Sequence, residues 1–273
     1  MQARLSLGAA RREHDEALPD FEFFRRLAGA AAAETLPRFR TRGATNANND
    51  VAYEPVSEAA RAAEKAIRGI IAADYPMDAM LGDQFGPSGS GPVQWVIDPI
   101  NGAKAFLCGL PVWGTLIGLT INGRPTMGMM SQPDTGECFW SDGTRSVCCS
   151  AQGETVLKTS GVQLLSESIC HTNSPEPFAR RPGRGFARLA SSVKFTRYGG
   201  DCYAFAMLAA GQIDLCVELS LQACNIAALI PVIEAAGGVV TRFDGGRAER
   251  GGNILASANA ILHEAALRVL NDI

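Results

Sequence analysis

Several residues that could do chemistry lie in one short stretch, WVIDPINGAKAF, at positions 95–106. An apolar run ends there at Asp98, and a proline and Gly102 then favour a turn. A carboxylate at the end of a strand can hold Mg²⁺ or exchange a proton with a substrate. Asn101, however, stands where a second carboxylate would bind a metal, and Ala103 where a hydroxyl would help an attacking water. The stretch is therefore a working site, a damaged site or a site with other chemistry.

Other reactive side chains follow similar patterns along the chain. Asp83 comes directly after a short apolar run at 79–82, and Glu218 ends the apolar run DLCVE. Glu218 is either an exposed charge at a strand end or a substrate contact. Asp201 follows two glycines, where it either caps a helix or lies beside backbone N–H groups that meet a substrate anion. Cys224 has no histidine nearby in the sequence, so a buried thiol is a better interpretation than a nucleophile.

The first half of the chain must supply the elements that position Asp83 and Asp98. Apolar residues at helical spacing predict helices at 18–38 and 55–75, separated by a polar loop. A strand is predicted at 93–98, and the pattern from 112 to 142 predicts consecutive antiparallel strands.

The second half alternates between apolar runs and helical patterns. Strands are expected at 164–172, 212–219, 239–243 and 254–259, and helices at 186–192, 201–211, 225–237 and 260–273. Helices followed by a β-rich stretch and then by alternation predict an α/β fold with two layers that share a cleft. We divide the chain into an N-terminal α+β half, 1–150, with the antiparallel sheet and the metal-site-like motifs, and a C-terminal α/β half, 151–273.

The composition is that of a globular protein, with 273 residues, 47% hydrophobic and 19% charged, and a net charge of −3. No basic stripe is present, so a nucleic-acid partner is not expected. No run is apolar and long enough to span a membrane, and the N-terminal residues lack the apolar core of a secretory signal. With eight cysteines in no Cys-x-x-Cys pair and three histidines, we expect reduced thiols, no zinc site and a cytoplasmic location.

Five motifs, in order and at matching spacing, resemble the inositol monophosphatase family and, within it, the histidinol-phosphate phosphatase branch. They are VSEAARAAE (56–64), GDQFG (82–86), WVIDPINGAKAF (95–106), GDCYAF (200–205) and CNIAAL (224–229). The resemblance runs from about residue 20 to the C-terminus. It implies a layered αβαβα sandwich, usually a dimer, in which carboxylates hold two divalent ions for phosphomonoester hydrolysis.

The sequence departs from the family pattern at the residues that do this chemistry. Asp83 stands in place of a metal-binding Glu, and Asn101 and Asn225 stand in place of metal-binding Asp. Ala60 and Ala103 replace the Asp and Thr that together position the attacking water in the family. An Asn keeps the shape and hydrogen bonding of Asp but not its charge. The resemblance thus predicts the fold while these departures predict altered chemistry.

We therefore predict a pseudo-phosphatase: a family-fold protein with a degenerate metal site, which has lost the two-metal machinery. It serves either as a metal-independent enzyme on a small polar metabolite or as a partner subunit, in a homodimer or in a heteromeric complex with a pathway partner. The alternative is a residual Mg²⁺-dependent phosphomonoesterase of the inositol phosphate or histidinol phosphate type. No cofactor is expected, or at most a single weak Mg²⁺ on Asp83, Asp98 and the Ile100 carbonyl.

The predicted site combines residues from both halves of the chain, and none is assigned as a metal ligand of a two-ion site. The predicted catalytic residues are Asp83, Asp98 and Asn101, and the predicted substrate-binding residues are Gly102, Ala103, Gly200, Asp201, Glu218 and Asn225.

Overall fold

The computed structural model describes residues 18–41, 54–180 and 185–271. The chain opens with two long helices, α1 (Phe21–Thr35) and α2 (Glu54–Asp74). Asp20 caps α1, because its side chain accepts a hydrogen bond from the backbone N–H of Phe23. Both helices were predicted, and the polar loop between them lies largely outside the described residues.

The first sheet contains the predicted antiparallel strands and extends beyond them. Its strands are β1 (Ala79–Gly82), β2 (Gly86–Ser88), β3 (Val93–Asn101), β4 (Gly114–Ile121), β5 (Arg124–Gln132), β6 (Glu137–Ser141), β7 (Ser146–Ser150) and β8 (Gly153–Val156). Their spatial order is β2-β1-β3-β4-β5-β6-β7-β8, and only β1 and β3 pair in parallel. The helix α3 (Ala103–Cys108) follows β3 directly.

The second sheet is mixed and smaller. Its strands are β9 (Ile169–Thr172), β10 (Phe195–Tyr198), β11 (Leu215–Leu221), β12 (Val239–Arg242) and β13 (Gly252–Ser257), in the order β10-β9-β11-β13-β12. Its helices are α4 (Glu176–Ala179), α5 (Gly185–Ser192), α6 (Asp201–Ala209), α7 (Ala223–Ile226), α8 (Leu229–Ala235) and α9 (Ala260–Asn271).

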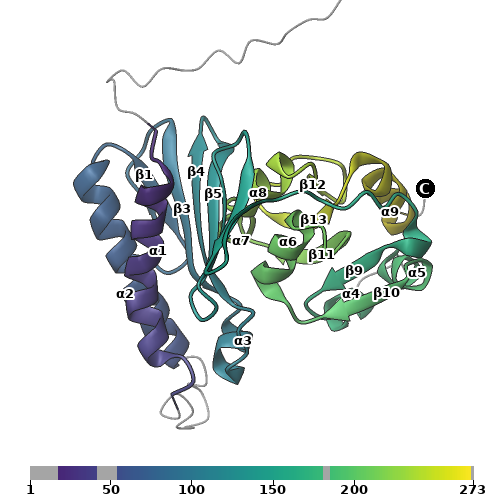
Figure 1. Ribbon diagram of the computed structural model, residues 1–273, viewed down its shortest axis with the longest axis horizontal. Coiled ribbons are helices and arrows are strands. Elements are labelled where there is room, and N and C mark those ends of the chain that lie inside the picture. Colours follow the sequence, from purple (N-terminus) through teal and green to yellow (C-terminus); the bar gives the residue numbers. More distant parts are fainter. Residues whose placement is uncertain (1–17, 42–53, 181–184, 272–273) are drawn as a thin grey trace, which may run out of the picture.

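These elements form five layers (Figure 1), which confirms the predicted αβαβα sandwich. The helices α1 and α2 cover one face of the first sheet through an apolar cluster that includes Phe24, Ile67 and Trp95. A second cluster, with Leu116 and Leu229, fills the space between the first sheet and the helices α6 and α8. A third cluster packs α5 and α9 on the outer face of the second sheet.

Two features of the fold differ from the sequence patterns. The predicted helix 225–237 is broken into α7 and α8, because Pro231 has no N–H to donate to the carbonyl of Ala227 one turn earlier. The hairpin β7–β8 was not predicted, since its strands are short and β8 is exposed along its whole length. The division at residue 150 falls at the end of β7, whereas the two sheets separate between Val156 and Ile169; the division into halves stays a prediction.

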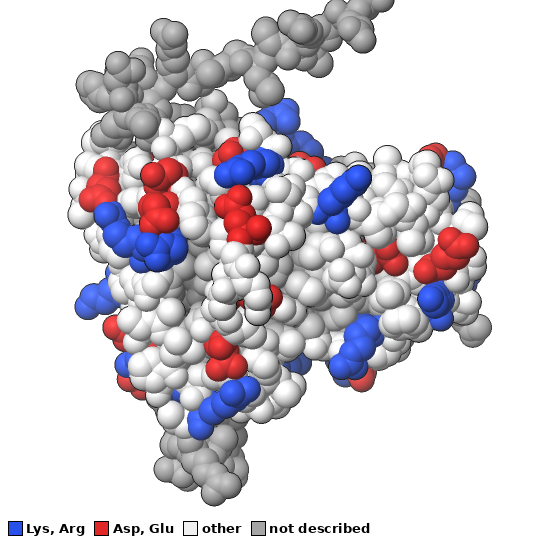
Figure 2. Space-filling model, viewed as in Figure 1, with Lys and Arg blue, Asp and Glu red and all other residues white. Residues whose placement is uncertain are grey.

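The surface has no dominant charge on the face shown in Figure 2, where acidic and basic side chains are interspersed. Within the described residues, no helix is both long enough and apolar enough to cross a membrane.

Candidate active site

The parallel pairing of β1 and β3 brings the predicted catalytic residues to one edge of the first sheet. Asp83 follows the end of β1, and its N–H donates to the Ile97 carbonyl of β3 at 3.0 Å. Asp98 lies one residue further along β3 and is 2% exposed. Strands that pair in parallel end at the same edge. The two carboxylates therefore meet although 14 residues of a hairpin and turn separate them in the sequence.

Two asparagines donate to the same oxygen of the Asp98 carboxylate. The amide Nδ2 atoms of Asn101 and Asn225 both donate to Asp98 Oδ2, at 2.9 Å and 2.8 Å. We call Asp83, Asp98, Asn101, Cys224 and Asn225 the carboxylate–amide cluster. The structure thus brings together all three predicted catalytic residues and Asn225, which was predicted as a substrate contact.

The orientation of both amides is set by backbone groups behind them. The Oδ1 atom of Asn101 accepts the N–H of Cys202 at 3.0 Å, at the start of α6. The Oδ1 atom of Asn225 accepts the N–H of Gln222 at 2.8 Å, in a capping box at the start of α7. Because both amide oxygens are used in this way, both NH₂ groups face Asp98. An aspartate at either position would make the same backbone bond and present its other oxygen to the cleft.

Burial governs the protonation of Asp98. Loss of solvation and, to a smaller extent, the nearby Asp83 carboxylate together raise its pKa to about 7. The two amide donors and the backbone N–H of Ile100 oppose this shift in part. Asp98 can therefore hold or release a proton near neutral pH.

Asp83 is bound by two side-chain donors. Gln84 Nε2 donates to its Oδ2 at 2.6 Å, and the Cys224 thiol donates to its Oδ1 at 3.6 Å. Burial, Asp98 and Asp83 all raise the pKa of Cys224. A thiol held protonated next to two carboxylates is a poor nucleophile, which supports the interpretation of Cys224 as a buried thiol.

These side chains offer little to a pair of magnesium ions. Mg²⁺ prefers oxygen ligands, mainly carboxylates, but Asn101 and Asn225 direct N–H groups into the cluster. Among the described residues, no three or more His, Cys, Asp or Glu side chains are grouped so that they could hold a metal ion. Asp83 and Asp98 are the two carboxylates that the cluster offers, and it contains no further carboxylate for a second ion.

The two alanines expected beside the attacking water lie in one apolar cluster. Ala60 of α2 is 3% exposed, and it belongs to a cluster with Ile100 and Trp113 against which Ala103 packs. The fold thus brings positions 60 and 103 into one environment. Because both residues are alanine, neither position supplies a carboxylate or a hydroxyl that could position a water.

Three of the predicted substrate-binding residues form a second group next to the cluster, namely Gly102, Asp201 and Glu218. Gly102 has a φ of +94°, and a Cβ on it would lie 3.1 Å from the Asp201 carboxylate carbon. Asp201 donates its backbone N–H to Asn173 Oδ1 at 2.7 Å, and the backbone N–H of Asn173 donates to Glu218 Oε1 at 2.6 Å. Asn173 therefore links Asp201 to Glu218, and Gly102 lies against Asp201 on the same side of the site.

Sequence reasoning did not single out Asn173 or Glu64. Asn173 lies beyond the end of β9 in a stretch without a distinctive pattern. Glu64 could have been noticed, because an acidic residue on the apolar face of a predicted helix must be compensated when buried, and Glu64 is fully buried.

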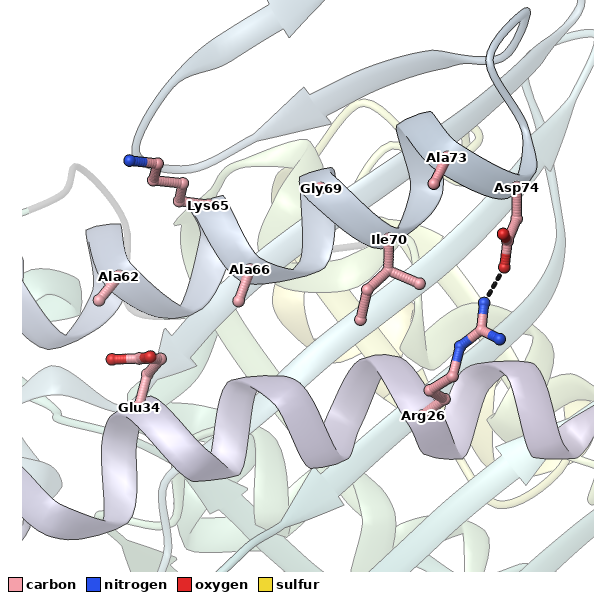
Figure 3. Close-up of a pocket in the computed structure, with 9 residues that line it drawn as sticks. All are labelled: Arg26, Glu34, Ala62, Lys65, Ala66, Gly69, Ile70, Ala73 and Asp74. Atoms are coloured by element: carbon pink, nitrogen blue, oxygen red, sulfur yellow. Dashed lines mark hydrogen bonds and ion pairs between the residues drawn. The ribbon is translucent and has the colours of Figure 1, made fainter.

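A separate groove runs between α1 and α2 on the surface and contains none of the predicted site residues. Its floor carries small side chains of α2, and Arg26 and Asp74 form an ion pair at one end (Figure 3).

Comparison with known proteins settles the family. The model of the inositol monophosphatase family matches residues 19–273. The chain belongs to this family. An inositol monophosphatase structure from Zymomonas mobilis superimposes with a TM-score of 0.83 at 30% identity, covering 91% of this chain and 96% of that chain.

Two relatives within the family are named as phosphatases. A histidinol-phosphatase of Streptomyces coelicolor is 36% identical over 262 residues, which are 93% of this chain and 97% of that protein. A chloroplastic bifunctional phosphatase of Arabidopsis thaliana, IMPL2, is 35% identical over 79% of this chain, and the match spans 65% of the plant protein's length. The predicted family and its histidinol-phosphatase-like branch are therefore confirmed.

The protonation of Glu218 predicts a pH-dependent stability. Burial and, to a smaller extent, the Asp201 carboxylate raise its pKa to about 7, although the Asn173 N–H opposes the shift. Between the pKa of an ordinary Glu and pH 7, the folded state then binds more protons than the unfolded state, so the free energy of unfolding falls as pH rises. Glu218→Gln should remove on the order of 1–3 kcal/mol of this change between pH 4.5 and 8, measured by urea denaturation. Asp98 retains a slope of its own in the same window, and Glu264→Gln, on the exposed face of α9, is the control. If the free energy of unfolding of Glu218→Gln depends on pH as in the wild-type protein, the raised pKa is not that of Glu218.

Proposed function

We propose that this chain binds a small phosphomonoester in the family cleft without the two-metal reaction, and that any hydrolysis is slow and uses one Mg²⁺ ion. The substrate class follows from the relatives, which are named as histidinol and inositol phosphatases. These comparisons favour a remaining phosphomonoesterase activity over its complete loss.

The pair of amide donors on Asp98 is the observation that carries this proposal. Each amide oxygen is bonded to a backbone N–H, so Asn101 and Asn225 turn NH₂ groups rather than oxygens toward Asp98. The positive ends of both NH₂ groups stabilise Asp98 in place of a metal. One ion would compete with these groups for Asp98, which predicts weak binding.

The remaining residues have separate tasks under this proposal. Asp83 and Asp98 would hold the single ion, which when bound polarises the phosphoryl oxygens and lowers the pKa of a water. Asp201 and Glu218 contact the alcohol portion of the substrate through hydroxyl or amine groups. Ala60 and Ala103 cannot orient a water, so attack proceeds without a general base from these positions.

A second candidate function is metal-independent work on a small polar metabolite, or a role as a partner subunit. The observation in its favour is that Asp98 and Glu218 both have a pKa raised to about 7, which suits proton exchange near neutral pH. Lower repulsion between the surviving carboxylates would also suit a neutral or cationic ligand. The dimer usual in the family and a cytoplasmic location belong to the proposal as well.

Ligand-induced shifts in melting temperature should separate the two candidates. We would screen phosphate esters, amino acids, amines and sugars, each with and without Mg²⁺, on wild type, Asp98→Ala and Glu218→Gln. Stabilisation by phosphomonoesters that increases with Mg²⁺ and is lost in Asp98→Ala supports the first candidate. A Mg²⁺-independent hit from another class, lost in Glu218→Gln, supports the second and rejects the first.

A further inference from the structure

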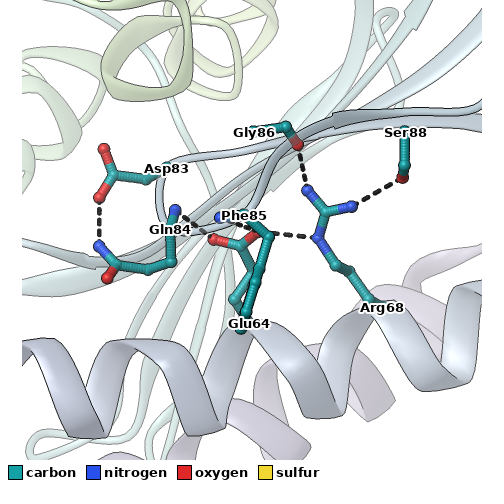
Figure 4. Close-up of polar contacts among 7 residues, drawn as sticks. All are labelled: Glu64, Arg68, Asp83, Gln84, Phe85, Gly86 and Ser88. Atoms are coloured by element: carbon teal, nitrogen blue, oxygen red, sulfur yellow. Dashed lines mark hydrogen bonds and ion pairs between the residues drawn. The ribbon is translucent and has the colours of Figure 1, made fainter.

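A buried ion pair lies directly beneath the turn that carries Asp83. Glu64 and Arg68 are one helical turn apart on α2, and Arg68 Nε donates to Glu64 Oε1 at 2.8 Å. Figure 4 shows both side chains facing the segment from Asp83 to Ser88. A fully buried carboxylate is costly unless it is paired and hydrogen-bonded, so its contacts indicate what the pair does.

Glu64 binds the backbone of the turn. Its Oε2 accepts the N–H of Gln84 at 2.7 Å, and its Oε1 accepts the N–H of Phe85 at 3.3 Å. The carboxylate lies so close that a Cβ on Gly82 would be 1.8 Å from Glu64 Oε1. Because Gly82 has no Cβ, the backbone of the turn can lie against the Glu64 carboxylate. This close approach gives a physical reason for glycine immediately before Asp83.

Arg68 binds the far side of the same turn. Its guanidinium donates to the carbonyl of Gly86 and, through Nη1, to Ser88 Oγ at 2.8 Å. The Arg68 side chain is 14% exposed, so its guanidinium is largely enclosed. A planar guanidinium can hold Glu64, Gly86 and Ser88 at once, whereas a lysine ammonium is a point charge on a flexible stem.

We propose that Glu64 and Arg68 are positioning residues for Asp83. The Asp83 N–H is bonded to the Ile97 carbonyl, and the next N–H, that of Gln84, is bonded to Glu64. With both flanking amides fixed, the Asp83 carboxylate is presented beside Asp98. Residues that orient a metal ligand or catalytic carboxylate typically change affinity or activity by about 10–100-fold when altered. The predicted effect on ion affinity rests on the proposed function. The predicted effect on the order of the turn that carries Asp83 does not.

Two variants test this role. Arg68→Lys keeps the charge but loses the planar guanidinium. Glu64→Gln replaces one of the two acceptor oxygens with an NH₂ donor, which cannot accept a backbone N–H. Arg38→Lys is the matched control, because Arg38 forms an i,i+4 pair with Glu34 on α1 at 3.1 Å, away from the turn. Melting temperature and circular dichroism establish that each variant is folded.

The first readout is amide hydrogen exchange at Gln84 and Phe85, and the second is the Mn²⁺ dissociation constant from electron paramagnetic resonance. We expect both site variants to exchange at least about tenfold faster at these amides and to bind Mn²⁺ about 10–100-fold more weakly, while Arg38→Lys changes neither by more than about twofold. Unchanged exchange in both variants overturns the proposal. Faster exchange with unchanged Mn²⁺ affinity overturns the positioning of Asp83.

The two proposals fail in distinguishable ways. If the wild-type protein binds no Mn²⁺, the one-ion part of the proposed function is wrong. The exchange rates then decide the inference alone: acceleration at Gln84 and Phe85 supports it, and protection equal to wild type overturns it.

Discussion

A quadruple variant is expected to hydrolyse small phosphomonoesters about 10²–10⁴-fold faster than the wild-type chain in millimolar Mg²⁺. It carries the substitutions Ala60→Asp, Asn101→Asp, Ala103→Thr and Asn225→Asp. This range is the typical contribution of a positioned general base, acting on a completed metal site. The measurement is release of inorganic phosphate from histidinol phosphate and from inositol phosphate.

The structure gives the reason for so large a gain. The backbone bonds that Cys202 and Gln222 make to Asn101 and Asn225 can be kept by aspartate, whose second oxygen then faces Asp98 and an ion. Positions 60 and 103 already lie at one apolar cluster, so an Asp and a Thr introduced there share one environment.

Two double variants serve as controls. Asn101→Asp, Asn225→Asp should strengthen Mg²⁺ binding in calorimetric titration and raise the rate only modestly, since no residue orients the water. Ala60→Asp, Ala103→Thr should leave Mg²⁺ affinity unchanged and lower stability, because it places a carboxylate in an apolar cluster. If the quadruple variant is folded and binds two ions but is no faster than wild type, the assignment of these four positions is wrong.

The wild-type chain is expected to turn over phosphomonoesters at least about a thousandfold more slowly than the histidinol-phosphatase of Streptomyces coelicolor assayed beside it. The factor combines a missing general base, worth roughly 10²–10⁴, with an incomplete metal site. The assay uses histidinol phosphate, inositol phosphate and p-nitrophenyl phosphate across a Mg²⁺ series.

The Mg²⁺ dependence of any residual rate adds a second criterion. A single ion predicts simple saturation in Mg²⁺, and Asp98→Ala should abolish the rate. A wild-type rate within about tenfold of the relative, or calorimetric binding of two ions with micromolar affinity, would show that Asn101 and Asn225 do not prevent two-metal chemistry.

The sequence alone determined the family, the order of the main elements and the identity of the unusual residues. The long amphipathic helices and the antiparallel strands have strong periodicity, so their positions follow from local patterns. The motifs around Asp98 and Asp201 indicated which residues share a site, because their spacing matches a known arrangement. The hairpin β7–β8 and the break before α8 escaped prediction, since short exposed strands and a single proline give weak local signals.

Only the tertiary structure decided how the altered residues interact. The sequence showed Asn where Asp was expected, but not that both amide oxygens are bonded to helix-start N–H groups and both NH₂ groups face Asp98. It did not show Asn173 as the link between Asp201 and Glu218, nor Glu64 and Arg68 beneath the Asp83 turn. Two of these bonds, from Asn101 to Asp98 and from Gln222 to Asn225, span three residues, whereas the others join segments between 18 and 127 residues apart. Side-chain orientation across such separations depends on how the layers pack, and no local sequence pattern records it.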